Sequence, residues 1–237
     1  MQTLRALLVA SLVLAASAAG TADARGRLQT RQTRVELAPG ARAGRIVLAN
    51  SGDAPLAAQI RVFRWTQRDG DDVLEPATDL VASPQVVEIA AGTDQLVRIV
   101  RTAGGPVASE MAYRVIVEEL PGDPTHQANS AVAVRMRYLI PAFVQAADAA
   151  PEALSCRVEK SVLVCRNDGG HAVQLGASTF VDATGRSIEL SEGLLGYVLA
   201  GSTRHFPFDA KALANAAPRE LKVFLNGAPS TLVLAAP

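Results

Sequence analysis

Alternation of apolar and polar side chains is the main pattern along this chain. It recurs in short segments at 45–50, 59–65, 85–89, 95–101, 113–119 and 131–140, and again at 161–166, 173–181, 196–198, 221–225 and 232–234. Period two indicates β-strands with one apolar face, and the glycine, proline and asparagine clusters between the segments indicate turns. The best helical signal is at 209–216, where Asp209 can cap a short turn. Many short strands at this spacing predict an all-β protein of the sandwich type.

The chain divides into two halves that follow one plan. Residues 145–153, QAADAAPEA, change the composition and are typical of a linker. Segments 49–63 and 166–180 echo each other, since each has an asparagine, a glycine-containing turn and a following apolar strand. We therefore expect two sandwich domains. Their predicted bounds are residues 25–146 and 147–237.

The segment 131–140 ends the first half and is its most informative strand. Its apolar side chains alternate at Val132, Val134 and Met136, and arginines occupy positions 135 and 137. A terminal strand is often an edge strand, and a flat apolar edge is an aggregation hazard that most proteins avoid. Such an edge can instead pair with a strand of another chain. From the segment alone, an ordinary core strand of a sandwich is the alternative.

Residues 1–24 have the pattern of a secretory signal peptide. Arg5 is followed by an apolar run and then by small residues with Ala-x-Ala sites. The apolar core is too short for a stable membrane span. We expect an exported protein whose mature chain begins after this segment.

Two cysteines, Cys156 and Cys165, lie in SCRVEKSVLVC with a turn near Lys160. If the flanks pair as a hairpin, the two thiols fall opposite each other and can form a disulfide, which suits an exported protein. Two free thiols, or half of a metal site, are the alternatives. A metal site would need further ligands, and no CxxC or nearby histidine pair supplies them.

Charge and motifs exclude several functions. The chain has 23 basic and 23 acidic residues, so its net charge does not indicate nucleic-acid binding. Asp168 and His171 could be two members of a hydrolase triad, but no G-x-S-x-G nucleophile elbow is present. No P-loop or dinucleotide glycine pattern occurs either. We expect no enzyme activity, no cofactor, no metal and no small-molecule substrate.

A series of phrases occurs in a fixed order along both halves. They are FRW (63–65) followed by Gln67 and Gly70, SPQVVEIAAGTDQLVRI (83–99), E-x-x-YRV (110–115), EELP (118–121), RYLIPAFV (137–144), NDGGHA (167–172) and GYVLAGSTRHF (196–206). In this order they resemble the periplasmic pilus-assembly chaperones of the PapD-like family, in particular the branch that serves archaic, spore-coat-protein-U-like pili. The resemblance covers essentially the whole mature chain.

The resemblance implies a fold and a function. The fold is two immunoglobulin-like domains in a boomerang arrangement, with a cleft between them. The function is donor-strand complementation in the periplasm, without ATP: the chaperone inserts one of its strands into a pilus subunit that lacks its last strand, and anchors the subunit's C-terminal carboxylate in the cleft. The implied partners are pilus subunits and an outer-membrane usher.

The family's functional positions can be placed on this sequence. The donor side chains are Val132, Val134 and Met136. Arg34, in TRVEL (33–37), matches the first-strand motif that contains the cleft arginine. The second anchor, usually a lysine before the proline that ends the donor strand, is matched by Arg137, with Arg135 as the fallback. Arginine keeps the cation and adds a fork that can hold a carboxylate by two hydrogen bonds.

Some alternatives stay open at this stage. A structural pilus subunit or surface adhesin is the rival function, although a subunit would lack its final strand and carry an N-terminal donor extension. Arg98 and Arg114 alternate with apolar neighbours. This fits either a solvated sheet face or electrostatic support of the cleft or of the interdomain contact, with Glu118 or Glu119 as partner. Trp65 is expected in the core of the first sandwich. The sequence does not decide whether the free protein self-associates through its exposed edge.

Overall fold

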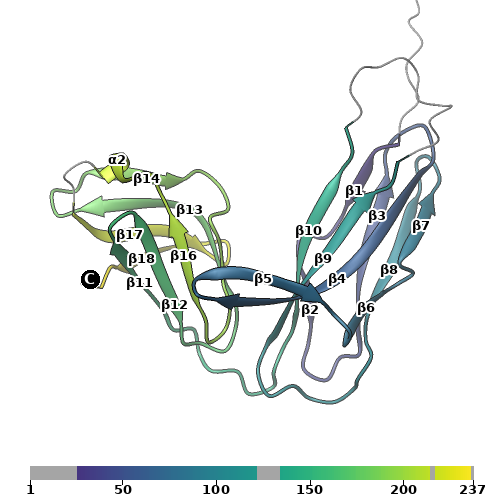
Figure 1. Ribbon diagram of the computed structural model, residues 1–237, viewed down its shortest axis with the longest axis horizontal. Coiled ribbons are helices and arrows are strands. Elements are labelled where there is room, and N and C mark those ends of the chain that lie inside the picture. Colours follow the sequence, from purple (N-terminus) through teal and green to yellow (C-terminus); the bar gives the residue numbers. More distant parts are fainter. Residues whose placement is uncertain (1–25, 122–133, 214–216, 236–237) are drawn as a thin grey trace, which may run out of the picture.

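The chain folds into two β-sandwiches that are joined at an angle and give the molecule the outline of a boomerang (Figure 1). The computed structural model describes residues 26–121, 134–213 and 217–235. The predicted all-β fold class is confirmed. The predicted signal peptide, residues 1–24, lies outside the described residues. Within them, no helix has the length and apolar character that crossing a membrane requires.

The first sandwich consists of two facing sheets. One has the order β1 (Leu28–Thr30), β3 (Ala43–Asn50), β8 (Asp94–Arg101), β6 (Leu80–Ser83). The other has the order β2 (Val35–Leu37), β10 (Arg137–Val144), β9 (Met111–Glu119), β4 (Leu56–Arg68), β5 (Asp71–Pro76), and β7 (Val86–Ile89) also pairs with β4. Their apolar faces meet in one core, in which Val97 and Ile99 are fully buried while Arg98 between them is exposed. Arg98 therefore lies on a solvated sheet face.

The second sandwich repeats this plan with fewer strands. One sheet contains β11 (Leu154–Glu159), β12 (Val162–Asn167) and β16 (Thr203–Pro207). The other contains β14 (Ser187–Ser191), β13 (Val173–Asp182), β17 (Pro218–Leu225) and β18 (Ala228–Val233), and β15 (Gly196–Val198) also pairs with β13. The helical signal corresponds to the short helix α2 (Ala210–Leu213), where Asp209 accepts the Lys211 N–H at 2.9 Å.

The sequence echo between the halves has a physical cause. Asn50 ends β3 and Asn167 ends β12, and both side chains are buried. Each donates to the carbonyl four residues later and accepts the N–H two residues later, at distances of 2.7–3.0 Å. Each amide also donates to a second strand of its domain. The same asparagine therefore closes the same turn in both sandwiches.

Cys156 and Cys165 form a disulfide, as predicted. They lie directly opposite each other in the β11–β12 hairpin, whose turn contains Lys160 at a φ of 54°. Both are buried and belong to the core of the second domain. The alternatives of free thiols and of a metal site are excluded for this pair.

The disulfide should stabilise the second domain selectively. Closing so small a loop contributes ~2.7 kcal/mol in the chain-entropy model. We expect the double variant Cys156→Ala/Cys165→Ala to exchange the amide hydrogens of β12 and β16 faster, while those of β3 and β8 in the first domain keep their protection. Hydrogen exchange resolved by peptide mass spectrometry measures both. An equal loss of protection in the two domains would contradict this prediction.

Candidate functional site

Strand β10 has an incomplete set of neighbours. On one side it pairs with β9 over all 8 of its residues. On the other side β2 runs parallel to it and pairs only with Ala142–Val144. The chain before β2 belongs to the opposite sheet, since β1 pairs with β3. Among the described strands, none covers the outer edge of Arg137–Pro141. The backbone groups of this segment that point away from β9 form an open hydrogen-bonding edge.

Apolar side chains are exposed along this edge and just before it. Val134 is 75% exposed, Met136 38% and Leu139 50%. The strand predicted at 131–140 begins only at Arg137 in the described chain, because β9 ends at Glu119 and offers no further partner. Met136 still accepts the Glu119 N–H at 3.0 Å, so its backbone stays beside the sheet. Val132 lies outside the described residues. The edge is therefore open and apolar, a combination that soluble proteins usually avoid.

Arg34 stands where β2 begins, next to the open edge. Val35 and Leu37 face the core, so Arg34 and Glu36 face the opposite side of the sheet. The Arg34 guanidinium carbon lies 4.3 Å from the centroid of the Phe143 ring, a cation–π contact. Its Nε lies 2.6 Å from a Glu36 oxygen, but the N–H is not directed at it and has no hydrogen-bond partner among the described residues. A buried donor without a partner is suited to receive an anion.

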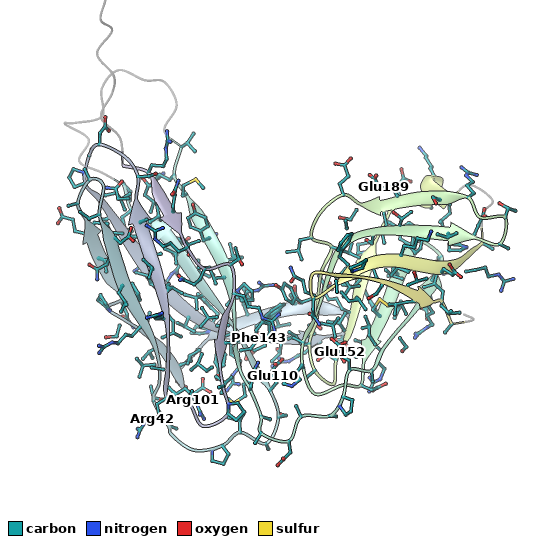
Figure 2. The ribbon with its side chains drawn as sticks, turned by 180° about the vertical axis from the view of Figure 1, so that it is seen from behind. Arg42, Arg101, Glu110, Phe143, Glu152 and Glu189 are labelled. Atoms are coloured by element: carbon teal, nitrogen blue, oxygen red, sulfur yellow. A yellow bond between two sulfur atoms is a disulfide. The ribbon has the colours of Figure 1, made fainter. Side chains whose placement is uncertain are left out.

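A cavity of about 520 Å³ adjoins Arg34 at the junction of the two domains. The first domain contributes Arg34, Glu36 and Gln145, and the second contributes Glu152, His171, Ala172, Gln174 and Asn226. Figure 2 shows Glu110, Phe143 and Glu152 at this junction, between the two lobes. The cleft implied by the sequence resemblance is therefore present, and Arg34 is part of its wall.

An aromatic cluster joins the two domains beside Arg34. The ring centroids of Trp65 and Phe143 are 6.2 Å apart, and that of Tyr197 is 5.5 Å from the first and 6.1 Å from the second. The cluster is completed by Ala112, Ala172 and Leu199. The prediction that Trp65 lies in the core of the first sandwich is wrong. It projects from the outer face of its sheet, which the second domain covers.

Arg114 packs on the same cluster. Its guanidinium carbon lies 3.6 Å from the Trp65 ring centroid and 5.3 Å from that of Tyr197. Burial lowers the pKa of Arg114, and the nearby carboxylate of Asp72 opposes this shift. No described residue forms a hydrogen bond or ion pair with its guanidinium. Arg114 therefore packs at the junction of the two domains and is not on a solvated sheet face, while its role in supporting the cleft stays a prediction.

The two half-buried arginines lie in one row across the sheet. Arg114 pairs with Pro141, and Arg34 precedes Val35, which pairs with Ala142. The backbones of Arg34 and Arg114 are thus two strands apart, about 10 Å. Both side chains are on the outer face, with Pro141 between them. Of the two, only Arg34 lines the cavity.

The predicted second anchor lies elsewhere on β10. Arg137 is four residues before Pro141, roughly 13 Å along the strand. Its Nε lies 3.2 Å from Glu118, which also pairs with Arg61. Arg135 is exposed. The structure therefore brings Arg34 to the open edge but does not bring Arg137 beside it. The anchor role of Arg137 or Arg135 stays a prediction.

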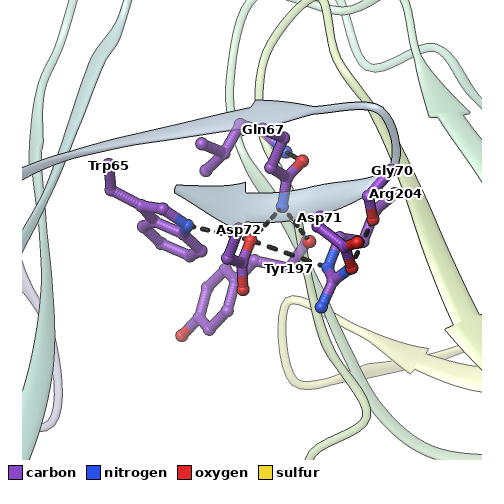
Figure 3. A network of polar contacts seen from close by, with 8 residues as sticks. Trp65, Gln67, Gly70, Asp71, Asp72, Tyr197 and Arg204 are labelled. Atoms are coloured by element: carbon purple, nitrogen blue, oxygen red, sulfur yellow. Dashed lines mark hydrogen bonds and ion pairs between the residues drawn. The ribbon is translucent and has the colours of Figure 1, made fainter. Parts of the chain in front are cut away.

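The hairpin β4–β5 connects the two domains (Figure 3). Its turn contains Asp69 and Gly70 at positive φ, and the Gly70 carbonyl accepts the His205 N–H of β16 at 2.9 Å. The Arg204 guanidinium also donates to this carbonyl, and it lies 2.9 Å from Asp71. The tip of a first-domain hairpin is thus held by a second-domain strand.

Two further side chains hold the domains together. Gln67 donates to the Tyr197 carbonyl at 2.8 Å and accepts the Leu199 N–H at 2.9 Å. Glu110 accepts the Ala172 N–H at 2.7 Å, and its carboxylate also contacts the ring of His171. The Glu110 side chain is only 1% exposed, so removing its partners would leave a buried charge. The angle between the domains is therefore fixed by polar contacts as well as by the cluster.

Within the described residues, no group of histidine, cysteine, aspartate and glutamate side chains is arranged to hold a metal ion. The site offers guanidinium groups, an open strand edge and exposed apolar side chains. These groups can bind an anion and a strand.

Comparison with known proteins agrees with this geometry. Residues 27–149 match the family described as pili and flagellar-assembly chaperone, PapD N-terminal domain. No curated protein matches the chain.

Several solved structures share the fold. One is a chain of the CsuC–CsuE chaperone–tip adhesion subunit pre-assembly complex from the archaic chaperone-usher Csu pili of Acinetobacter baumannii, with a TM-score of 0.70, 23% identity, and 88% of this chain and 98% of that one covered. Another is a chain of the Salmonella enterica SafA pilin–SafB chaperone complex, with a TM-score of 0.61, 18% identity, and 88% and 96% covered. The Pseudomonas aeruginosa CupB2 chaperone has a TM-score of 0.61, 16% identity, and 87% and 100% covered.

Gly70 should be required for the contact between hairpin and second domain. Its φ is +84°, and a Cβ there would stand 2.1 Å from the His205 Nδ1. We expect Gly70→Ala to push the hairpin tip away from β16 and to increase the radius of gyration measured by small-angle X-ray scattering.

The matched control is Gly185→Ala. Gly185 has the same φ of +84° but nothing within 4 Å of a new Cβ. Both variants carry the backbone strain of a left-handed alanine, ~1–2 kcal/mol. Only Gly70→Ala should change the radius of gyration, and an equal change in both would contradict the role of the hairpin.

Proposed function

Because the chain belongs to the PapD family of pili and flagellar-assembly chaperones, we propose that it is a periplasmic chaperone that binds pilus subunits by donating the open edge of β10. The solved structures of similar fold include a chaperone with a tip adhesion subunit and a chaperone with a pilin. These likenesses support subunits of the same kind as partners. Delivery of the subunit to an outer-membrane usher is part of the proposal.

The observation that carries the proposal is the position of Arg34 at the end of the open edge. Exposed apolar residues precede that edge in the chain, and the half-buried guanidinium of Arg34 lies at its far end. An incoming strand gains main-chain hydrogen bonds from Arg137–Pro141 and apolar contacts from Val134 and Met136. Its terminal carboxylate gains charge-assisted hydrogen bonds from Arg34. The same two requirements, a missing strand and a free C-terminus, define a pilus subunit.

The geometry also gives the direction of the bound strand. β2 runs parallel to β10 and starts immediately after Arg34. A subunit strand that ends in a carboxylate at Arg34 lies in line with β2 and runs in the same direction. It is therefore parallel to β10. The open edge of five residues can accommodate about 16 Å of such a strand.

Binding needs no chemical energy. Burying Val134 or Met136 in a pocket of the subunit contributes about 1.5–3 kcal/mol each, before the cost of ordering the segment. Arg114 adds a second cation to the carboxylate site, from the same sheet face as Arg34. We assign it this role in addition to the residues identified from sequence.

The rival function, a structural subunit or adhesin, is not favoured. A subunit without its last strand would leave its own core open. In the first domain β10 occupies its place beside β9, and the core residues Ile140, Ala142 and Val144 are buried.

Loss of the Arg34 cation should weaken subunit binding with little effect on stability. We propose to co-produce the protein in a periplasm with each exported pilin-like protein of the same genome, and to purify the complex. Hydrogen bonds to a charged group contribute ~1.5–3 kcal/mol, so Arg34→Ala should weaken the complex at least tenfold. The control is Arg31→Ala, which removes an exposed arginine paired with Asp94. An unchanged complex with Arg34→Ala would refute the anchor role.

Val134 should act in the complex and not in the free protein. Because its side chain is 75% exposed, Val134→Asp should keep the thermal stability of the free chaperone. It should nevertheless abolish protection of a subunit from aggregation, measured by light scattering. Val233→Asp, at a site that is 79% exposed on the second domain, is the matched control and should protect normally. Equal protection of the subunit by both variants would contradict the assignment of Val134 as a donor side chain.

A further inference from the structure

We propose that the aromatic cluster between the domains positions the guanidinium groups of Arg34 and Arg114, so that docking of the second domain sets the affinity of the first domain for a carboxylate. The inference rests on the proposed function, because the carboxylate is that of the bound subunit. It assigns Phe143 and Tyr197 as positioning residues. Neither of them needs to touch the subunit.

Phe143 connects Arg34 to the second domain. Its ring is fully buried and carries the Arg34 guanidinium on one face. The Tyr197 ring is its neighbour from the second domain, 6.1 Å away between centroids. The orientation of the Arg34 fork therefore depends on a ring whose own place depends on domain docking.

Arg114 reaches the same tyrosine by a second route. Its guanidinium lies over Trp65, and Trp65 and Tyr197 make an edge-to-face contact at 5.5 Å. Tyr197 also lies within 5.3 Å of the Arg114 guanidinium directly. Both routes converge on Tyr197, which is the one aromatic ring that the second domain contributes to the described cluster. The polar contacts of Gln67 with the backbone of Tyr197 and Leu199 hold this ring against the first domain.

Positioning matters here because neither guanidinium donates a hydrogen bond to a described residue, and only Arg34 has an ion-pair neighbour, Glu36. An arginine side chain loses much rotamer freedom when it is fixed, and its fork binds a carboxylate well only in one orientation. The rings fix the guanidinium planes without using their hydrogen-bond donors. Without the Phe143 ring, Arg34 would be free to turn its donors toward Glu36, whose carboxylate is already 2.6 Å from its Nε. Glu36 would then compete with the carboxylate of the subunit.

The test uses the full chain and two NMR readouts. The first is the chemical shift of the Arg34 Nε–H, which the ring current of Phe143 displaces. The second is the affinity for N-acetylvaline, a minimal C-terminal residue, from titration of the same signal, with N-acetylvalinamide as the uncharged comparison. We expect N-acetylvaline to bind the wild type and the amide not to bind.

The key variant is Tyr197→Leu, because it alters the second domain and leaves both arginines and Phe143 in place. We expect it to move the Arg34 Nε–H signal toward its value in a free chain and to weaken N-acetylvaline binding by about fivefold, the effect of losing a cation–π contact. Tyr197→Phe keeps the ring and should restore both readouts. Phe143→Leu should reproduce the effect of Tyr197→Leu from the first domain.

Phe208→Leu is the matched control. Phe208 also contacts an aromatic ring, that of Phe180 at 5.4 Å, but it lies in the core of the second domain. It should change neither readout. Amide spectra establish that each variant is folded, and Tyr197→Leu keeps the test valid if Phe143→Leu does not fold.

The outcomes separate the two proposals. If Tyr197→Leu is folded and leaves the Arg34 signal and the N-acetylvaline affinity unchanged, the positioning role is overturned while the anchor stands. If N-acetylvaline fails to bind the wild type, the carboxylate anchor of the proposed function is overturned, and the Arg34 signal in Tyr197→Leu still decides whether the cluster positions the side chain. A loss of affinity in Phe208→Leu equal to that in Tyr197→Leu would show a general loss of stability and would also overturn the inference.

Discussion

The change of sheet between β1 and β2 is the constraint on which the rest of the structure depends. The first segment of the chain pairs with β3 in one sheet and then crosses to pair with the last residues of β10 in the other. Because β2 is only 3 residues long, most of β10 has no partner on that side among the described strands. The crossing also brings Arg34 to the point where that edge ends. One topological feature thus produces both the open edge and the cation beside it.

The second constraint is that the outer face of the β2–β10–β9–β4 sheet is covered at one end and open at the other. At the covered end, Phe143 and Trp65 are buried by the second domain. At the open end, Leu139 is half exposed and Arg137 pairs with Glu118 in solvent. Arg34 and Arg114 lie at the boundary between the two ends. No described residue accepts a hydrogen bond from either guanidinium, although the Glu36 carboxylate lies 2.6 Å from the Arg34 Nε. Both guanidinium groups rest on aromatic rings, and a cation–π contact uses none of their hydrogen-bond donors.

Sequence patterns predicted most of the longer strands, the disulfide and the duplicated asparagine turn because these depend on local periodicity and on residues close in the chain. They missed β5, β6, β14 and β16. They failed for Trp65, since period two shows which residues share a face but not what covers that face. The signal was nevertheless present in 140–144, where the unbroken run IPAFV is buried on both sides of the strand. Arg114 was left undecided for the same reason. The pairing of Arg137 with Glu118 across β9 depends on register, which alternation alone does not fix.

An open apolar edge has to be kept from indiscriminate pairing, and the structure shows how this is done. Among the described strands, the part of β10 that has no partner on its outer side extends from Arg137 to Pro141, and proline has no N–H to donate. Arg135 and Arg137 place positive charge beside the apolar side chains, so a second copy of the same edge would bring like charges together. A strand that ends in a carboxylate meets no such penalty, because its charge is complementary to Arg34. Under the proposed function, the edge would therefore select for a partner with a free C-terminus, and the short length that limits aggregation would also make the proposed anchor necessary for affinity.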